Sequence, residues 1–303
     1  MRWQLRAGAV TAAVLSTVAA IGASSGSGGS DPPVVGGAAT YVVRAGDSLR
    51  SVSSRQGIDV GMLAEENGVR VDAKLRAGQE LRVDNRHIVP PGADIGVLVI
   101  NVPQRMLFYA GDDGTRLAFP VAVGRRDWPT PLGPFTVIVT ETQPTWDVPQ
   151  SILEEARRAG RTLPERVPPG PENPLGEFWI GLSLGSVGVH GTNAPSSIYR
   201  AATHGCIRLH SDDVAELFPL VRVGTPGRVL YEPVLLTTDG DAVLLEVHRD
   251  VYGHVREGLF ERARSRAAAA GLTNRIDWTI ADAVIQARRG VARNVTKQEF
   301  APD

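Results

Sequence analysis

Short apolar runs separated by glycine fill residues 94–231 and constrain the fold of this chain more than any other feature. The runs are rich in Val, Ile, Leu and Phe, and the clearest are 97–102, 105–110, 117–123, 135–139, 178–184 and 186–190. Turn-bounded runs at this spacing are typical of a β-sandwich or barrel. We therefore predict a mainly β domain over 94–231, with one helix from 212 to about 221 that Ser211 caps.

A proline-rich insertion, 142–177, interrupts the predicted strands. A segment of this length inside a compact domain is usually functional or disordered. Trp146 and the Pro/Gly-rich run 168–176 favour an ordered lid over a cleft, with a short helix over 152–159. A mobile surface loop is the alternative.

Residues 40–84 predict a separate, small α+β unit. Residues 41–44 alternate as a strand, and Asp47 is placed to cap a helix over 48–56 that Gly57 ends. A second helix from about 60 and a closing strand over 75–83 complete a strand–helix–helix–strand order.

This order, with Tyr41-Val42-Val43, Gly46-Asp47-Ser48-Leu49 and Gly78-Gln79-Glu80-Leu81, resembles a LysM domain. The resemblance implies a module that binds N-acetylglucosamine-containing glycans, between the first strand–helix loop and the second helix–strand loop. The glycan-binding residues that it implies here are Gly46, Asp47, Ser48, Asn67, Gly68 and Val69. Asp47 and Gly46 have purely structural alternatives, as a cap and a turn.

The N-terminus has the layout of an export signal. Arg2 and Arg6 precede a charge-free run, 7–21, and small residues follow that run. We predict a signal peptide over 1–23 and a flexible Gly/Ser-rich linker over 24–39, and hence a periplasmic protein. An uncleaved membrane anchor is the alternative.

Cys206 is the only cysteine, which excludes an intramolecular disulfide. It lies in the run Thr203-His204-Gly205-Cys206-Ile207-Arg208, and His190 precedes Gly191 upstream. A thiol near an imidazole suits nucleophilic acyl transfer, because the imidazole takes the proton and later returns it. Gly205 lets the backbone approach a substrate, and the amides of Gly205 and Cys206 are candidate oxyanion donors.

Two other interpretations of these residues remain open. A lone cysteine or histidine is often simply buried, and His190, His204 and Cys206 can ligate zinc, although no fourth ligand is obvious. The spacing alone permits either histidine as the base.

The motif resembles the L,D-transpeptidases of the YkuD family, and the match extends to Gly124 and to Thr130-Pro131-Leu132-Gly133-Pro134-Phe135. The resemblance implies that Cys206 attacks the third residue of a tetrapeptide stem and expels D-alanine. His190 takes the thiol proton while the Gly191 carbonyl holds its ring, and His204 lines the site. No metal or organic cofactor is implied.

The same resemblance implies substrate-binding roles for Arg208, Thr203, Asn193 and Trp146. Residues 168–176 and 190–193 are similar to a periplasmic subgroup that attaches an outer-membrane lipoprotein to peptidoglycan. The expected partners are therefore peptidoglycan stems and strands, and a lysine-bearing lipoprotein as one acceptor. A stem amine, giving a 3-3 cross-link, and water, giving a carboxypeptidase, are the other acceptors.

The last segment, 232–303, predicts an α/β extension with a strand over 243–247 and helices over 256–270 and 278–289. It carries no catalytic pattern.

The net charge of −1 gives no basic field for nucleic acid. Besides a transpeptidase, the sequence permits a cysteine enzyme that only hydrolyses murein, and a non-catalytic wall-binding protein.

Overall fold

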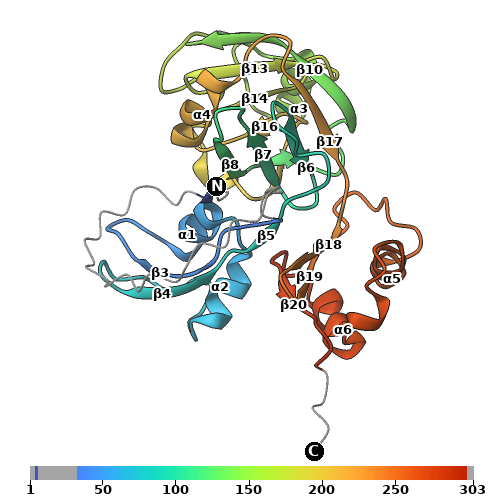
Figure 1. Ribbon diagram of the computed structural model, residues 1–303. Helices are drawn as coiled ribbons and strands as arrows, with labels where there is room; N and C mark the ends of the chain where they lie inside the picture. The colour runs from blue at the N-terminus through green and yellow to red at the C-terminus, as the bar shows by residue number, and fades with distance from the viewer. Residues whose placement is uncertain (1–3, 6–32, 299–303) are drawn as a thin grey trace, which may run out of the picture.

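The computed structural model describes residues 4–5 and 33–298. The predicted signal peptide, apart from residues 4–5, and residues 24–32 of the predicted linker lie outside the described residues. The described chain forms a small N-terminal unit, a large β domain and a C-terminal extension, and the unit and the extension lie side by side below the β domain (Figure 1).

One mixed sheet organises the β domain. Its strand order is β1-β8-β7-β6-β17-β10-β13-β14-β16. The strands are β1 (Gln4–Leu5), β6 (Leu98–Asn101), β7 (Met106–Ala110), β8 (Arg116–Pro120), β10 (Gly133–Thr142), β13 (Phe178–Leu182), β14 (Gly188–His190), β16 (Ile207–Arg208) and β17 (Pro226–Leu230). A small sheet pairs β9 (Val123–Gly124) with β15 (Ala201–Thr203). The fold class is confirmed as mainly β.

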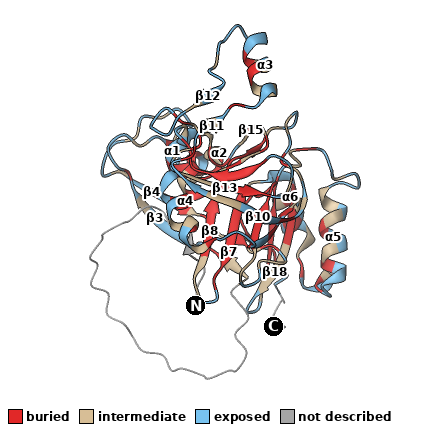
Figure 2. Cartoon of the chain, turned by 90° about the horizontal axis from the view of Figure 1, so that it is seen from above, coloured by how far each residue is buried: buried red, intermediate tan, exposed pale blue. Residues whose placement is uncertain are grey.

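The apolar runs explain this sheet. All residues of β6 and β7 are buried, because the sheet is covered on both faces. The sequence of such a strand is a continuous apolar run rather than an alternation of apolar and polar residues. Figure 2 shows buried strands of this sheet, β7 among them, in red near the centre of the molecule. Helix α4 (Ser211–Leu217) and the 3₁₀ turn η2 (Phe218–Leu220) follow β16.

The predicted cap of α4 is wrong by one residue. His210, not Ser211, is the N-cap, and it makes no side-chain capping bond. Ser211 is the first helical residue, and its hydroxyl instead donates to the Thr192 carbonyl at 3.4 Å. This bond ties the start of α4 to the loop after β14.

The insertion forms an ordered cap. Strands β11 (Trp146–Asp147) and β12 (Arg166–Val167) pair antiparallel and carry α3 (Gln150–Arg158), which stands out from the body of the domain (Figure 2). The predicted short helix is therefore present, shifted by two residues at its start.

The N-terminal unit has the predicted order. Its elements are β3 (Ala38–Val42), α1 (Leu49–Gln56), α2 (Val60–Glu66) and β4 (Glu80–Asp84), and β3 pairs antiparallel with β4. Gly57 ends α1 in the left-handed conformation, at φ 66°, which glycine adopts at little steric cost.

Two expectations for this unit are wrong. Ser48, not Asp47, caps α1, through a reciprocal capping box with Ser51. The Asp47 carboxylate instead accepts from the Tyr41 hydroxyl at 2.7 Å and the Arg44 amide at 2.8 Å. The end of the predicted linker is also not flexible, because β2 (Val34–Val35) pairs with β5 (His87–Ile88) and β3 begins at Ala38.

The C-terminal extension packs two helices against a small sheet. It contains β18 (Val234–Asp239), β19 (Ala242–Val247), β20 (Arg293–Asn294), α5 (Leu259–Ala269), the 3₁₀ turn η3 (Thr273–Arg275) and α6 (Trp278–Ala287). The remaining 3₁₀ turn, η1 (Pro195–Ser197), lies in the β domain after β14.

A buried carboxylate joins the three parts. Glu246 of β19 is fully buried. Its oxygens accept from His87 Nδ1 at 2.8 Å, the Ile88 amide at 2.5 Å, Gln104 Nε2 at 3.1 Å and His248 Nε2 at 2.8 Å. These donors come from β5, the β domain and the extension, and His87 Nε2 in turn lies 2.8 Å from the Gly57 carbonyl of the N-terminal unit. A buried charge with this many donors holds its partners firmly, because each would be left unsatisfied without it.

The extension also clamps the N-terminal unit directly. Arg293 pairs with Asp84, and with Glu66 at 2.7 Å. Val291 is buried in the same apolar cluster as Leu49 and Leu63. The extension therefore completes the core of the N-terminal unit and fixes its position.

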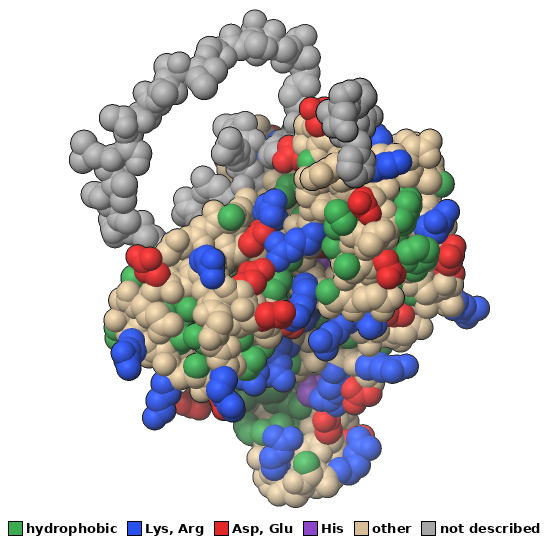
Figure 3. Space-filling view, turned by 90° about the horizontal axis from the view of Figure 1, so that it is seen from below, with side chains coloured by type: hydrophobic (Ala, Val, Ile, Leu, Met, Phe, Trp, Pro, Cys, Tyr) green, Lys and Arg blue, Asp and Glu red, His purple; other side chains and the backbone are tan. Residues whose placement is uncertain are grey.

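The surface carries charges of both signs. Seen from below, Lys and Arg side chains alternate with Asp and Glu side chains over the exposed face (Figure 3). Within 4–5 and 33–298, no helix combines the length and apolar character needed to cross a membrane.

Candidate active site

A cavity of about 380 Å³ lies between the sheet edge and the cap. Six of the residues singled out by the sequence line it, namely Trp146, His190, Thr203, His204, Cys206 and Arg208. Ile152 of α3 and Leu175, which follows β12, also contribute from the cap. The insertion thus forms part of the wall around the predicted nucleophile.

Parallel pairing of β14 with β16 brings Cys206 close to His190. Val189 lies opposite Ile207 in this pair, and His190 lies opposite Arg208. Gly205 has φ +113°, and a Cβ there would lie 3.2 Å from a Val187 methyl group. The turn that presents the thiol therefore requires glycine for its backbone conformation and its space.

Cys206 is a partly exposed residue that lines the cavity. Burial raises the pKa of this thiol, and a backbone hydrogen bond with Gly188 and the charge of Arg208 oppose the rise without cancelling it. The free site therefore holds a protonated thiol at pH 7. The pKa of the thiol therefore lies above its ordinary value, because the local desolvation outweighs the favourable interactions.

His190 is buried and its ring is fixed. Its Nδ1 donates to the Gly191 carbonyl at 2.6 Å, and the Leu175 backbone also hydrogen-bonds the ring. With Nδ1 protonated, Nε2 is the acceptor of the neutral imidazole. Burial, aided by the charge of Arg208, lowers the pKa of His190 to about 3. The imidazole is therefore neutral at pH 7 and able to accept a proton. Among the described residues it makes no hydrogen bond to the thiol.

The loop around Gly205 differs from the predicted oxyanion site. The Gly205 amide donates to Thr203 Oγ1 at 3.1 Å, and that hydroxyl donates to the Cys206 carbonyl at 2.6 Å. The Gly205 amide is thus occupied, and the Thr203 hydroxyl braces the loop at the cavity wall. Within the described chain the Cys206 amide makes no hydrogen bond, so it is the donor left for an oxyanion.

His204 connects the site to the cap. Its Nε2 lies 2.6 Å from a Glu155 oxygen and 3.2 Å from Arg125 Nη1. Arg125 also donates to Glu155 at 2.7 Å, and the Trp128 ring packs edge-on against His204 at 5.1 Å. The hydrogen bonds from His204 and Arg125 lower the pKa of Glu155. This ion-paired cluster fastens α3 beside Cys206.

Sequence reasoning missed Glu155 and Arg125. Glu155 is one acid among several charged residues of the insertion, 49 positions from His204, and no local pattern distinguishes it. Only the folded cap brings it to the site.

Arg208 and Asn193 differ in their placement. Arg208 lines the cavity, and its Nε has no hydrogen-bond partner among the described residues. Burial lowers the pKa of its guanidinium, which still remains charged. Asn193 is exposed outside the cavity wall, where its amide donates to the Glu172 carbonyl at 3.3 Å. The predicted contact of Asn193 with substrate is therefore not supported by its position.

The residues predicted to bind glycan do not share one hollow. Asp47 and Ser48 line a groove of about 460 Å³ against the β domain. Val69 lines a shallower hollow, and Arg50 belongs to both. Asn67 is used structurally, since its side chain bonds to the Leu63 carbonyl and to both backbone groups of Arg82. Gly46 and Gly68 are turn residues with positive φ.

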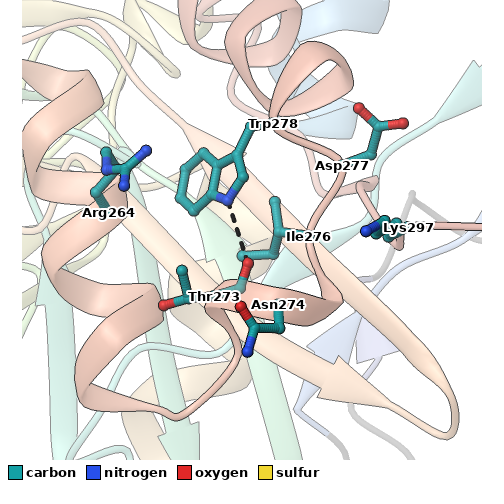
Figure 4. A pocket seen from close by; sticks show the side chains of 7 residues that line it. All are labelled: Arg264, Thr273, Asn274, Ile276, Asp277, Trp278 and Lys297. Carbon is teal, nitrogen blue, oxygen red and sulfur yellow. Dashed lines mark hydrogen bonds between the residues drawn. The ribbon is translucent and has the colours of Figure 1, made fainter.

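A larger hollow, of about 580 Å³, lies on the extension (Figure 4). There the Arg264 guanidinium lies 5.1 Å from the centre of the Trp278 ring, and Trp278 Nε1 donates to the Thr273 carbonyl. It contains no thiol or histidine, so the chemistry favours the smaller cavity. In the part of the chain that the structure describes, no His, Cys, Asp and Glu side chains gather as a metal site.

Comparisons with known proteins agree on the class of both main units. The model of the L,D-transpeptidase catalytic domain matches residues 95–230, and that of the LysM domain matches residues 41–84. The probable L,D-transpeptidase ErfK/SrfK of Escherichia coli K12 is 30% identical over 223 residues, covering 71% of this chain and 72% of the relative. The probable L,D-transpeptidase YbiS of the same strain is 33% identical over 176 residues, covering 57% of each.

Solved structures of similar proteins are more distant. The avibactam carbamoyl enzyme of Ldtfm is 22% identical with a TM-score of 0.35, covering 44% of this chain and 48% of that one. L,D-transpeptidase 3 from Mycobacterium tuberculosis is 16% identical with a TM-score of 0.35, covering 64% and 92%.

Proposed function

Because this chain belongs to the L,D-transpeptidase family, we propose that it is a peptidoglycan L,D-transpeptidase in which Cys206 is the nucleophile. The observation that carries the proposal is the shared cavity of Cys206, His190 and Arg208 under an ordered cap. Export to the periplasm and retention at the wall by the LysM unit are part of the same proposal, since the substrate is there.

In the first step, the Cys206 sulfur attacks the carbonyl carbon of the third stem residue. A C–S bond forms, the amide C–N bond breaks, and D-alanine leaves with its amine. His190 Nε2 takes the thiol proton and gives it to the leaving amine. The lowered pKa of His190 and the raised pKa of Cys206 support transfer during the attack, from a neutral pair, rather than a preformed thiolate–imidazolium pair.

The Cys206 amide supports the oxyanion of the tetrahedral intermediate in this proposal. A positioned oxyanion donor typically contributes about 10²–10³-fold in rate. The Arg208 guanidinium orients an anionic group of the donor stem, which its open Nε position and its charge inside the cavity support.

In the second step, an amine attacks the thioester: a C–N bond forms, the C–S bond breaks, and the proton that the amine loses passes through His190 to the leaving Cys206 sulfur. The amine is a side chain of another stem, which gives a 3-3 cross-link, or a lysine of an outer-membrane lipoprotein. Amide is exchanged for amide through the thioester, so no ATP is needed. Water in place of the amine gives a carboxypeptidase.

Purified protein incubated with tetrapeptide muropeptides tests the proposal. We expect D-alanine release together with new cross-linked species whose yield depends on the added amine. D-alanine release without amine dependence would indicate a hydrolase. Binding without turnover would indicate a wall-binding protein, and either result would overturn the proposal.

A further inference from the structure

A second groove lies between the LysM unit and the β domain. It measures about 460 Å³. On one side are the loop before α1 and the serine-rich face of α1, including Ser48 and Ser51. On the other side are Ser196 of η1 and His210, which precedes α4. Neither domain forms this groove alone.

Ion pairs hold the two walls at a fixed separation. Arg55 of α1 donates through Nη1 to both oxygens of Asp212, at 2.7 and 2.8 Å, and lies 3.6 Å from Asp213. The clamp between the extension and the LysM unit fixes the same interface from the other side. A preformed groove loses little conformational entropy on binding.

One wall carries a polar group with no partner. His210 is only 4% exposed, and its Nε2 has no hydrogen-bond partner within the described chain. Burial, aided by the charge of Arg55, lowers the pKa of His210 to about 4, and the charge of Asp212 and a backbone hydrogen bond with Ser54 oppose this shift without cancelling it. The ring is therefore neutral at pH 7. An unsatisfied buried polar group is costly, and a ligand with hydroxyl or amide groups can satisfy it.

The lining suits a neutral, hydroxyl-rich ligand. Ser48, Ser51, Ser54 and Ser196 line the groove from both domains. The Ser51 and Ser54 hydroxyls already donate to the Ser48 and Ser51 carbonyls, so they are left as acceptors for a ligand. Three arginines and two aspartates line it, which leaves one net positive charge. Arg55 is already paired with Asp212. This charge balance is weak for recognition of an anion and leaves hydrogen bonding as the main interaction.

The groove is connected to the catalytic strands. His210 follows β16 two residues after Arg208, and Ser196 follows His190 by six residues. The Leu209 amide donates to the His190 carbonyl at 2.9 Å, so the two segments are joined next to the active site. A ligand held by these segments is held by the backbone that carries the reacting groups.

We propose that this groove is a composite glycan site, in which Ser196 and His210 of the β domain complete the sugar-binding surface of the LysM unit. The proposal rests on the proposed function, because it makes the glycan strand part of the same substrate. Sugar residues bound there lie against the segments that continue from His190 and Cys206. The LysM unit then orients the strand whose stem reacts, besides retaining the enzyme at the wall.

Ser196→Trp in the full-length protein tests this assignment, since Ser196 is exposed and an indole there fills the groove from the catalytic side. Ser265→Trp on the exposed face of α5 is the matched control. Chitohexaose, titrated by calorimetry, is the probe. We expect Ser196→Trp to weaken the dissociation constant at least tenfold and Ser265→Trp to leave it unchanged.

Unchanged chitohexaose binding by Ser196→Trp, or no binding by the wild-type protein, would overturn the composite site. Acylation by a sugar-free tetrapeptide is measured on the same samples. It should be equal in the wild type and both variants, because the catalytic cavity is not altered. Loss of acylation in Ser196→Trp alone would mean that the indole distorts the active site. That result would refute the claim that the groove and the catalytic cavity are separate sites. Failure of the wild type to be acylated would instead refute the proposed function.

Discussion

Glu246→Gln is the sharpest test of how the three parts are held together. Burial alone would raise the pKa of Glu246, but its interactions with His87 and His248 outweigh that and lower it to about 2. Glu246→Gln removes this charge and its favourable interactions with both rings. The amide also turns an NH₂ group toward donors, so we expect a total loss of about 3–5 kcal/mol.

The pH dependence of this loss has a definite sign. Glu246 has a depressed folded-state pKa, so its contribution is complete above about pH 4.5 and is lost as the pH falls toward 2. The difference between wild type and Glu246→Gln should therefore be large at pH 7 and shrink below pH 4.5. Thermal unfolding followed by circular dichroism measures it.

At pH 7 we expect the midpoint of Glu246→Gln to fall by about 6–10 °C, from about 2 °C per kcal/mol in a chain of this size. Glu141→Gln, at an exposed position of β10, is the matched control and should change it by less than about 1 °C. If Glu246→Gln lowers the unfolding midpoint no more than the control does, the claim that the buried carboxylate holds the domains together is refuted.

Three further predictions concern the thiol, the cap and the clamp. The rate of Cys206 alkylation by iodoacetamide should keep rising above about pH 8.5, because burial raises the pKa of the thiol. A rate that reaches a plateau between about pH 5 and 7 would indicate a thiolate–imidazolium pair instead. Glu155→Gln should raise KM for the stem by about two- to fivefold with kcat nearly unchanged, because it loosens α3 from His204. An equal loss in kcat would mean that Glu155 takes part in the reaction itself. Arg293→Ala should cost about 1–2 kcal/mol and expose the LysM unit to limited proteolysis, whereas an unchanged digestion pattern would contradict the clamp.

Local patterns predicted those features that depend on neighbouring residues. The strand–helix–helix–strand order follows from residue periodicity and from Gly57, and the mainly β domain follows from glycine-bounded apolar runs. His190 and Cys206 were expected together, and the β14–β16 pairing brings them to one cavity.

What the sequence could not predict depends on distant contacts or on competition between close alternatives. Glu155 reaches His204 only through the folded cap, and Glu246 meets His87 across 159 positions. The Gly205 amide was expected to face an oxyanion, but the Thr203 hydroxyl competes for it locally. The sequence places a thiol near an imidazole, but the desolvation that raises the pKa of the thiol could not be known before its surroundings were built.

The central claim is that the Cys206 sulfur forms the covalent intermediate, and intact-mass spectrometry after incubation with a carbapenem tests it most directly. The account predicts one adduct per chain in the wild type, on the peptide that contains Cys206, and none in Cys206→Ala. An adduct that persists in Cys206→Ala, or a folded wild-type protein that is never acylated, would contradict it.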